Sequence, residues 1–174
     1  AAFVRTNVEG TASLLDACRA VWRDRADVLF HHVSTDEVFG SLGRSGYFSE
    51  RSPYDPRSPY SATNAAAVHL VRAYGHTYGI PYTISNCSNN YGPYQHPEKM
   101  IPLMILNMVS GKPLPVYGDG GQVRDWLYVL DHCDAVWRII TRGSVGATYT
   151  VAGENEWKNI RLVRELCRIV ARET

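Results

Sequence analysis

Three short stretches of the sequence carry side chains that can exchange protons. In the first, two adjacent carboxylates, Asp36 and Glu37, follow a serine and a threonine. Burial and mutual repulsion can separate the pKa values of neighbouring carboxyls, so that one donates a proton while the other accepts. In the second, Tyr60 and Asn64 lie four residues apart, which places both on one face of a helix. The third, NCSNNYGPY at 86–94, supplies short amides. Taken singly, each stretch also fits an ordinary structural role: a solvated loop or cap, a packed tyrosine, or a loop rich in asparagine.

The elements that would position these side chains alternate between helical and strand patterns. Apolar residues recur every three or four positions near the start, which predicts an amphipathic helix. We expect helices at about 1–23, 60–78, 98–110, 131–142 and 159–172, and strands at about 27–35, 81–88, 123–129 and 147–152. This order is typical of α/β proteins with a mainly parallel sheet. Such sheets place their active sites at the carboxyl ends of strands, where Ser34–Gly40 would lie.

A phosphate-binding turn is not evident. No GxGxxG pattern occurs, and the one GxxGxxG spacing, GSLGRSG at 40–46, lies in the loop after the predicted strand at 27–35 and not at the start of a helix. A doubly wound sheet holds the pyrophosphate of a dinucleotide on a glycine-rich turn between its first strand and first helix. The densest cluster, 118–121, lies between the strand-like stretches PVY and VRDWLYV. We interpret it as a hairpin turn rather than a phosphate-binding turn. If the sheet is Rossmann-like, we expect its first half to lie outside this sequence.

Composition limits the other classes of function. The 174 residues are 45% hydrophobic and 20% charged with a net charge of +1, so neither a nucleic-acid partner nor a membrane segment is expected. Small molecules or other copies of the chain are the expected partners. The four cysteines form no CxxC pair, which argues against a zinc site and a disulfide scaffold and favours a cytoplasmic location. The first residue is not methionine, so we expect the natural start to lie upstream.

Several motifs occur together in one order. They are FVRTNVEGT (3–11), STDEVFG (34–40), SPYSATNAAAVHLVRAY (58–74), NCSNNYGPYQHPEKMIPLMI (86–105), GKPLPVYGDGGQVRDWLYVLDH (111–132) and NEWKNI (155–160). This combination resembles the extended short-chain dehydrogenase/reductase superfamily and, within it, the dTDP-glucose 4,6-dehydratases. The Asp-Glu pair after the threonine is what separates these dehydratases from epimerases and decarboxylases of the same fold.

The resemblance implies a fold and a reaction. The fold would be a partial Rossmann-like doubly wound parallel sheet, without its first nucleotide-binding half, over about 1–92, followed by mixed substrate-lobe and sheet segments over 93–174. The reaction would convert dTDP-glucose to dTDP-4-keto-6-deoxyglucose through bound NAD, in a protein that forms a homodimer when complete. No metal is implied.

The resemblance also implies residue roles. Tyr60 would take the proton of the C4 hydroxyl, Glu37 would remove the C5 proton, Asp36 would protonate the departing C6 hydroxyl, and Thr35 would hold the substrate near C4. The positions that match the cofactor site are Thr6, Tyr60, Asn64 and Asn90. Those that match the sugar-nucleotide site, besides Thr35, are Asn89, Lys99, Met100, Pro115, Val116, Tyr117, Arg124 and Asn159. A guanidinium such as that of Arg124 can fork onto diphosphate oxygens.

Asn64 departs from the family pattern, which has a lysine there. A lysine lowers the pKa of the tyrosine through its charge, whereas asparagine brings none. Two alternatives therefore stay open: another nucleotide-sugar dehydratase or epimerase of the superfamily, and a catalytically inactive binding or scaffold protein. We also expect that this chain alone does not retain NAD, and that Asp36, Glu37, Tyr60 and Asn64 share one cleft.

Overall fold

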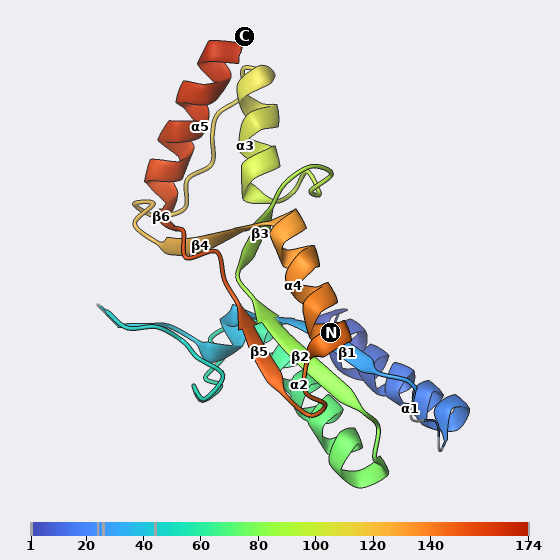
Figure 1. Ribbon diagram of the computed structural model, residues 1–174. Helices are drawn as coiled ribbons and strands as arrows, with labels where there is room; N and C mark the ends of the chain where they lie inside the picture. The colour runs from blue at the N-terminus through green and yellow to red at the C-terminus, as the bar shows by residue number, and fades with distance from the viewer. Residues whose placement is uncertain (1, 24, 26, 44, 174) are drawn as a thin grey trace. The chain divides into compact units, whose positions relative to one another are not determined.

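The computed structural model describes residues 2–23, 25, 27–43 and 45–173 (Figure 1). Helices and strands alternate along the chain, as the sequence predicts. In order, the elements are η1 (Val4–Glu9), α1 (Gly10–Trp22), β1 (Phe30–Thr35), η2 (Asp36–Phe39), α2 (Pro59–Tyr78), β2 (Tyr82–Cys87), β3 (Asn89–Tyr91), α3 (Met100–Val109), β4 (Val123–Tyr128), α4 (Val129–Arg142), β5 (Thr148–Val151), β6 (Glu156–Lys158) and α5 (Asn159–Glu173).

The chain divides into two compact units. The first contains the residues up to Cys87 together with Cys133–Val151, and the second contains Ser88–His132 and the residues from Ala152 onward. The sequence placed the change from sheet to lobe near residue 92. In the structure the chain passes from the first unit to the second slightly earlier, after β2. It returns to the first unit for most of α4 and for β5.

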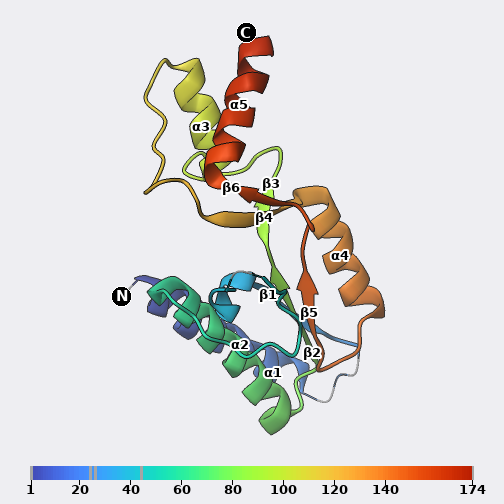
Figure 2. The same cartoon turned by 90° about the vertical axis from the view of Figure 1, so that its left-hand side faces the viewer.

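The first unit is built on a parallel sheet with the strand order β1-β2-β5. Helices α1 and α2 lie side by side on one face of this sheet (Figure 2). Their shared core holds Leu15 of α1, Val68 and Val71 of α2, and Ile84 of β2, all fully buried. Five of the six residues of β2 are buried, as expected for a parallel strand covered on both faces. The parallel α/β architecture is therefore confirmed.

The second unit combines a small mixed sheet with a pair of helices. Strand β4 pairs with β3 in parallel and with β6 in antiparallel orientation. Helices α3 and α5 lie against each other (Figure 1) and bury Met104, Val163 and Leu166 between them.

Some sequence-based predictions were wrong in detail. No strand is formed by PVY at 115–117, so the turn at 118–121 connects coil to β4 and is not a hairpin turn. The short strands β3 and β6 were not predicted, because three residues carry too little periodicity to identify. The first predicted helix begins with the π-helical turns of η1 before α1. Among the described residues, no helix has the length and apolarity needed to span a membrane.

Candidate active site

The Asp36-Glu37 pair lies on a short 3-10 helix, η2, directly after β1. Thr35 begins this helix, and its Oγ1 accepts a hydrogen bond of 3.2 Å from the backbone N–H of Glu37. Val38 and Phe39, the last two residues of η2, are buried against α2. Because they anchor the turn in the core, both carboxylates are held half-buried at the carboxyl end of β1.

Gly40 ends this turn in a conformation that favours glycine. Its φ is +88°, and a Cβ added there would overlap the carbonyl oxygen of Asp55. The N–H of Asp55 donates to the carbonyl of Val38 at 2.9 Å. The loop before α2 is thus fastened directly to the Asp36-Glu37 turn.

Tyr60 lies in the first turn of α2. Ser58 and Ser61 form a reciprocal capping box and Pro59 occupies the first turn, so the helix start is strongly specified. The Tyr60 side chain is 39% exposed, with its ring edge-to-face against Phe3 at a centroid distance of 5.6 Å. The tyrosine therefore sits at the surface of the unit with its ring supported on one side.

The backbone around Tyr60 is fixed by a chain of hydrogen bonds. Asn7 of η1 donates to Thr63 at 2.9 Å, and Thr63 donates to the Tyr60 carbonyl at 2.8 Å. The side-chain amide of Asn64 donates to the same carbonyl at 3.0 Å. Thr6, predicted to bind the cofactor, is exposed on the π-helical turn beside Asn7. Such turns are frequent at functional sites.

The electrostatic surroundings of Tyr60 raise the pKa of its hydroxyl above the usual value. Burial is the largest cause, followed by the negative charge of Glu37, with Cys87 and Asp36 acting in the same direction. The neutral amide of Asn64 acts in the opposite direction without overcoming them. Tyr60 thus lies within electrostatic reach of both carboxylates, and the structure brings Asp36, Glu37, Tyr60 and Asn64 to one edge of the sheet.

Thr35 and Cys87 are paired in the register of β1 and β2, so both strands end at this edge. The Cys87 thiol donates to the carbonyl of Ser34 at 3.3 Å. Sequence analysis did not single out Cys87, because a cysteine among asparagines carries no distinctive spacing.

The other predicted site residues lie in the second unit. Asn89 and Asn90 are on β3, Lys99 precedes the first turn of α3, and Met100 packs between α3 and α5. Arg124 is exposed on β4. The Oδ1 atom of Asn89 is buried without a hydrogen-bond partner, which leaves a buried acceptor beside Asn90.

The loop with Pro115, Val116 and Tyr117 is fastened to the start of α5, where Asn159 lies. The N–H of Gly120 donates to the Tyr117 carbonyl at 3.2 Å, and the N–H of Ile160 donates to the Gly120 carbonyl at 3.0 Å. The Oδ1 atom of Asn159 is buried without a hydrogen-bond partner. Four residues predicted to surround the sugar nucleotide are therefore neighbours within this unit.

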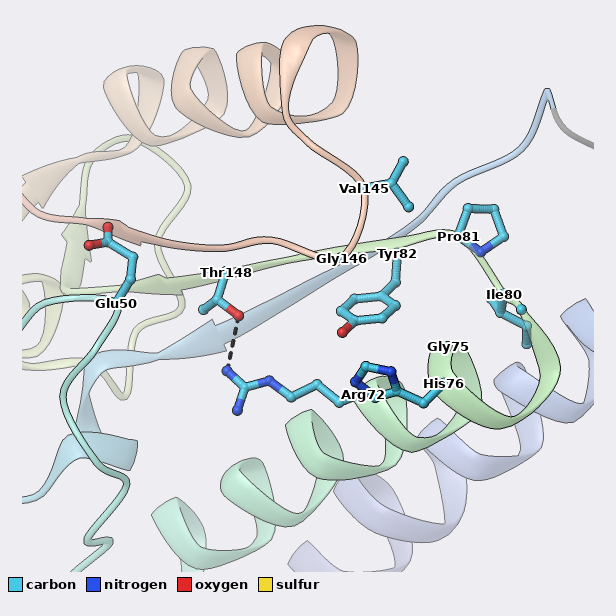
Figure 3. A pocket seen from close by; sticks show the side chains of 11 residues that line it. Glu50, Arg72, Gly75, His76, Ile80, Pro81, Tyr82, Val145, Gly146 and Thr148 are labelled. Carbon is cyan, nitrogen blue, oxygen red and sulfur yellow. Dashed lines mark hydrogen bonds between the residues drawn. The ribbon is translucent and has the colours of Figure 1, made fainter.

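A cavity in the first unit lies away from these groups (Figure 3). It has a volume of about 600 Å³ and is lined by α2, the start of β2 and β5, at the opposite end of the strands from Thr35 and Cys87. Its charged groups already have partners: Arg72 donates to Thr148 at 3.0 Å, and Glu50 accepts from the N–H of Thr150 at 2.9 Å. We locate the site by its reactive side chains and not by this cavity.

The parallel sheet, the tyrosine on α2 and the Thr-Asp-Glu turn together define a Rossmann-like protein of the short-chain dehydrogenase/reductase class. The chain belongs to the GDP-mannose 4,6 dehydratase family, whose model matches residues 1–174.

Within this family, the chain is similar to several dTDP-glucose 4,6-dehydratases. The chain is 56% identical over 174 residues to a dTDP-glucose 4,6-dehydratase of Neisseria gonorrhoeae, covering 97% of this chain and 50% of the relative. It is similar to the crystal structure of dTDP-glucose 4,6-dehydratase from Bacillus anthracis in complex with NAD, with a TM-score of 0.89, 46% identity, and coverage of 95% of this chain and 52% of that chain. The corresponding Streptomyces venezuelae enzyme with NAD and TYD bound gives a TM-score of 0.90 at 43% identity, covering 95% and 50%.

These comparisons confirm the resemblance to 4,6-dehydratases. The chain spans about half the length of the curated relatives it matches.

Proposed function

We propose that this chain is the catalytic portion of a dTDP-glucose 4,6-dehydratase, a hydro-lyase that removes water from a nucleotide-linked glucose. The observation that supports this most directly is the placement of Asp36 and Glu37 within electrostatic reach of Tyr60. An epimerase needs a proton-accepting tyrosine but no adjacent acid and base for elimination. The paired carboxylates therefore favour the dehydratase over the epimerase.

The residues present fit the nicotinamide end of NAD. Tyr60 and Thr6 offer exposed hydroxyls and Asn64 a side-chain amide, groups suited to hydrogen bonds with ribose. When bound, NAD would supply a reversible hydride acceptor: the hydride leaves the sugar and is later returned to it. The pyrophosphate would be held by a glycine-rich turn between a strand and a helix, and the one GxxGxxG spacing here, at 40–46, does not lead directly into a helix.

The protein's own side chains divide the proton transfers. Tyr60 accepts the proton of the C4 hydroxyl, while Thr35 orients that end of the sugar. Glu37 then removes the proton at C5, which the C4 ketone has made acidic, and Asp36 gives a proton to the departing C6 hydroxyl. Such positioned acids and bases each contribute about 10²–10⁴-fold to rate. The half-buried setting of the turn limits competition from water.

The residues of the second unit would bind the nucleotide sugar. Arg124 and Lys99 would hold the diphosphate oxygens, since guanidinium and ammonium groups donate charge-assisted hydrogen bonds to phosphate. Asn89 and Asn159, each with a buried acceptor that lacks a partner, would accept hydrogen bonds from hydroxyls or ring N–H groups. The loop at 115–117 would line the sugar-nucleotide site.

Asn64 favours a second candidate, an inactive binding or scaffold protein, because it removes the charge that activates the tyrosine. The intact set Thr35, Asp36, Glu37 and Tyr60 favours the enzyme. We expect an enzyme with low turnover at neutral pH that becomes faster as the solution approaches the pKa of Tyr60.

We also propose that the protein forms a homodimer and works in the cytoplasm. Leu14 and Val21 of α1 are 61% and 71% exposed, leaving an apolar strip on this helix that a second copy could cover. None of the four cysteines, which all lie within the described residues, is in a disulfide, as is typical of a reducing compartment.

The test uses this chain joined to the flanking N- and C-terminal segments of the Neisseria gonorrhoeae relative, which we call the completed chain. Incubated with dTDP-glucose, it should form the 4-keto-6-deoxy product, and Glu37→Gln should reduce this by at least about a hundredfold. UDP-glucose and GDP-mannose serve as competing substrates. Formation of a C4 epimer, or faster turnover of either competitor, would contradict the proposal.

A further inference from the structure

The side-chain amide of Asn90 is held at both ends. Its Nδ2 donates to the backbone carbonyl of Ser88 at 3.1 Å, and its Oδ1 lies 2.9 Å from Nδ1 of His132. The Asn90 carbonyl also accepts a hydrogen bond of 2.8 Å from the side chain of Gln95. Backbone and side chain of Asn90 are therefore both fixed from within the second unit.

These contacts determine where the protons lie. A carbonyl oxygen can only accept, so the Asn90 atom that faces Ser88 must be nitrogen and the atom that faces His132 must be oxygen. An amide oxygen also only accepts. His132 must therefore carry a proton on Nδ1, and in the neutral ring Nε2 is then left with a lone pair.

The environment of His132 agrees with a neutral ring. Its Nε2 atom is buried and has no hydrogen-bond partner, so protonation there would leave a buried donor unpaired. Burial lowers the pKa of His132 below its usual value. His132 lies in the first turn of α4, directly after β4, and β4 pairs with the strand that carries Asn90.

We propose that His132, as the Nδ1–H tautomer, is a positioning residue that fixes the amide of Asn90 for cofactor binding. Without a donor at His132 the oxygen of the Asn90 amide loses this hydrogen bond, so the orientation of the amide is less restricted. This inference rests on the proposed function in one respect, the assignment of Asn90 to the NAD site. The Asp-His pair at 131–132 belongs to a motif of the sequence, but only the structure shows that its histidine reaches Asn90.

The first test measures the tautomer. In the completed chain, with ¹⁵N-labelled histidine, the two ring nitrogens of His132 give different shifts and coupling patterns for the Nδ1–H and Nε2–H forms. The signal is assigned by its loss in His132→Asn. We expect the Nδ1–H form at neutral pH. An Nε2–H ring would overturn the proposal whether or not the protein is a dehydratase.

The second test asks whether residue 132 acts through its hydrogen-bond donor or only through the volume of its side chain. Asparagine can place an N–H close to the position of the imidazole Nδ1, aspartate of equal size offers only acceptors, and leucine offers neither. NAD⁺ affinity is measured by equilibrium dialysis after bound nucleotide is removed. We expect affinity within about twofold of the parent for His132→Asn and about tenfold weaker for His132→Asp and His132→Leu, the loss of one hydrogen bond to a buried group.

Two controls make the result decisive. His76→Asn, on the exposed end of α2, should leave NAD⁺ affinity unchanged, and circular dichroism identifies any variant that fails to fold. Equal weakening of NAD⁺ binding in the asparagine, aspartate and leucine variants, or no weakening in any of them, would contradict a positioning role. Dialysis needs no turnover, so a protein that binds NAD⁺ with this pattern but forms no product would refute the proposed function alone.

Discussion

Tyr60 must lose a proton to act as a base, yet the residues around it make this harder. Burial and the negative charge of Glu37 raise the pKa of its hydroxyl, and Asn64 contributes only a neutral amide. Each unit of pKa corresponds to about 1.4 kcal/mol. At neutral pH the tyrosinate is therefore a minor species, and its fraction increases as the pH rises toward the pKa of Tyr60.

Replacing Asn64 by lysine should reverse this effect. In the completed chain we expect Asn64→Lys to lower the pKa of Tyr60 and to raise turnover near neutral pH; two units would correspond to about 2.7 kcal/mol, or about a hundredfold in rate. The gain should shrink toward high pH, where Tyr60 ionises unaided. Product formation followed from about pH 6.5 to 10 tests this, with Asn64→Gln as the uncharged control. Equal rates at neutral pH would show that Asn64 is not limiting.

At the residue scale, sequence patterns predicted the reactive groups but not all of their contacts. Adjacent carboxylates and helical spacing made Asp36, Glu37 and Tyr60 candidates, and the resemblance to 4,6-dehydratases supplied their roles. The bond from Asn64 back to the Tyr60 carbonyl and the bond from His132 to Asn90 depend on side-chain directions and on a sheet register that no local pattern specifies.

At the element scale, the Asp36-Glu37 turn depends on Gly40. Gly40→Ala would place a Cβ against the Asp55 carbonyl at a φ of +88°, so we expect destabilisation of about 2 kcal/mol or more. Urea unfolding of the first unit measures this. Gly43→Ala is the matched control, because a Cβ there has no neighbour within 4 Å. Equal midpoints for the two variants would show that the turn tolerates a side chain.

Strand β1 carries a histidine that should make stability depend on pH. Burial, with a smaller contribution from the charge of His31, lowers the pKa of His32 to about 4 from a usual value of 6.5. The unfolded chain then binds a proton that the folded chain does not, so this stability is full above 6.5 and is lost as pH falls toward 4.

We therefore expect the unfolding free energy to fall by about 2 kcal/mol more between pH 7 and pH 5 in the native chain than in His32→Phe. Phenylalanine keeps the stacking on Phe30 and does not titrate. Urea unfolding at both pH values provides the comparison. Parallel losses in the two proteins would mean that His32 is already solvated in the folded state.

Sequence periodicity predicted the longer helices and strands but not the shortest strands. The helices at 60–78 and 159–172 were predicted to within about two residues because of their apolar faces and, for the first, its capping residues. Strands β3 and β6 form because they pair with β4. Such pairing is a tertiary contact, which local periodicity does not reveal. For the same reason, the strand-like residues PVY form no strand: they have no partner along which to pair.

At the scale of the whole molecule, the proposed homodimer would use the exposed apolar residues of α1. We expect the completed chain to sediment as a dimer and Leu14→Lys with Val21→Lys to sediment as a monomer, because both side chains are more than half exposed on one helix. Thr77→Lys on α2, an exposed polar position, controls for added charge. A monomeric parent, or a dimeric double variant, would contradict this assignment of the surface.

The most direct test of the central claim follows one hydrogen of the substrate. The completed chain carrying Asn64→Lys is given dTDP-glucose with deuterium at C4, and the product is examined by mass spectrometry and NMR. Internal transfer through bound NAD, with Asp36 and Glu37 eliminating water, predicts a 4-keto-6-deoxy product with the deuterium at C6. A product with the deuterium returned to C4, or no product although NAD is bound, would contradict the account.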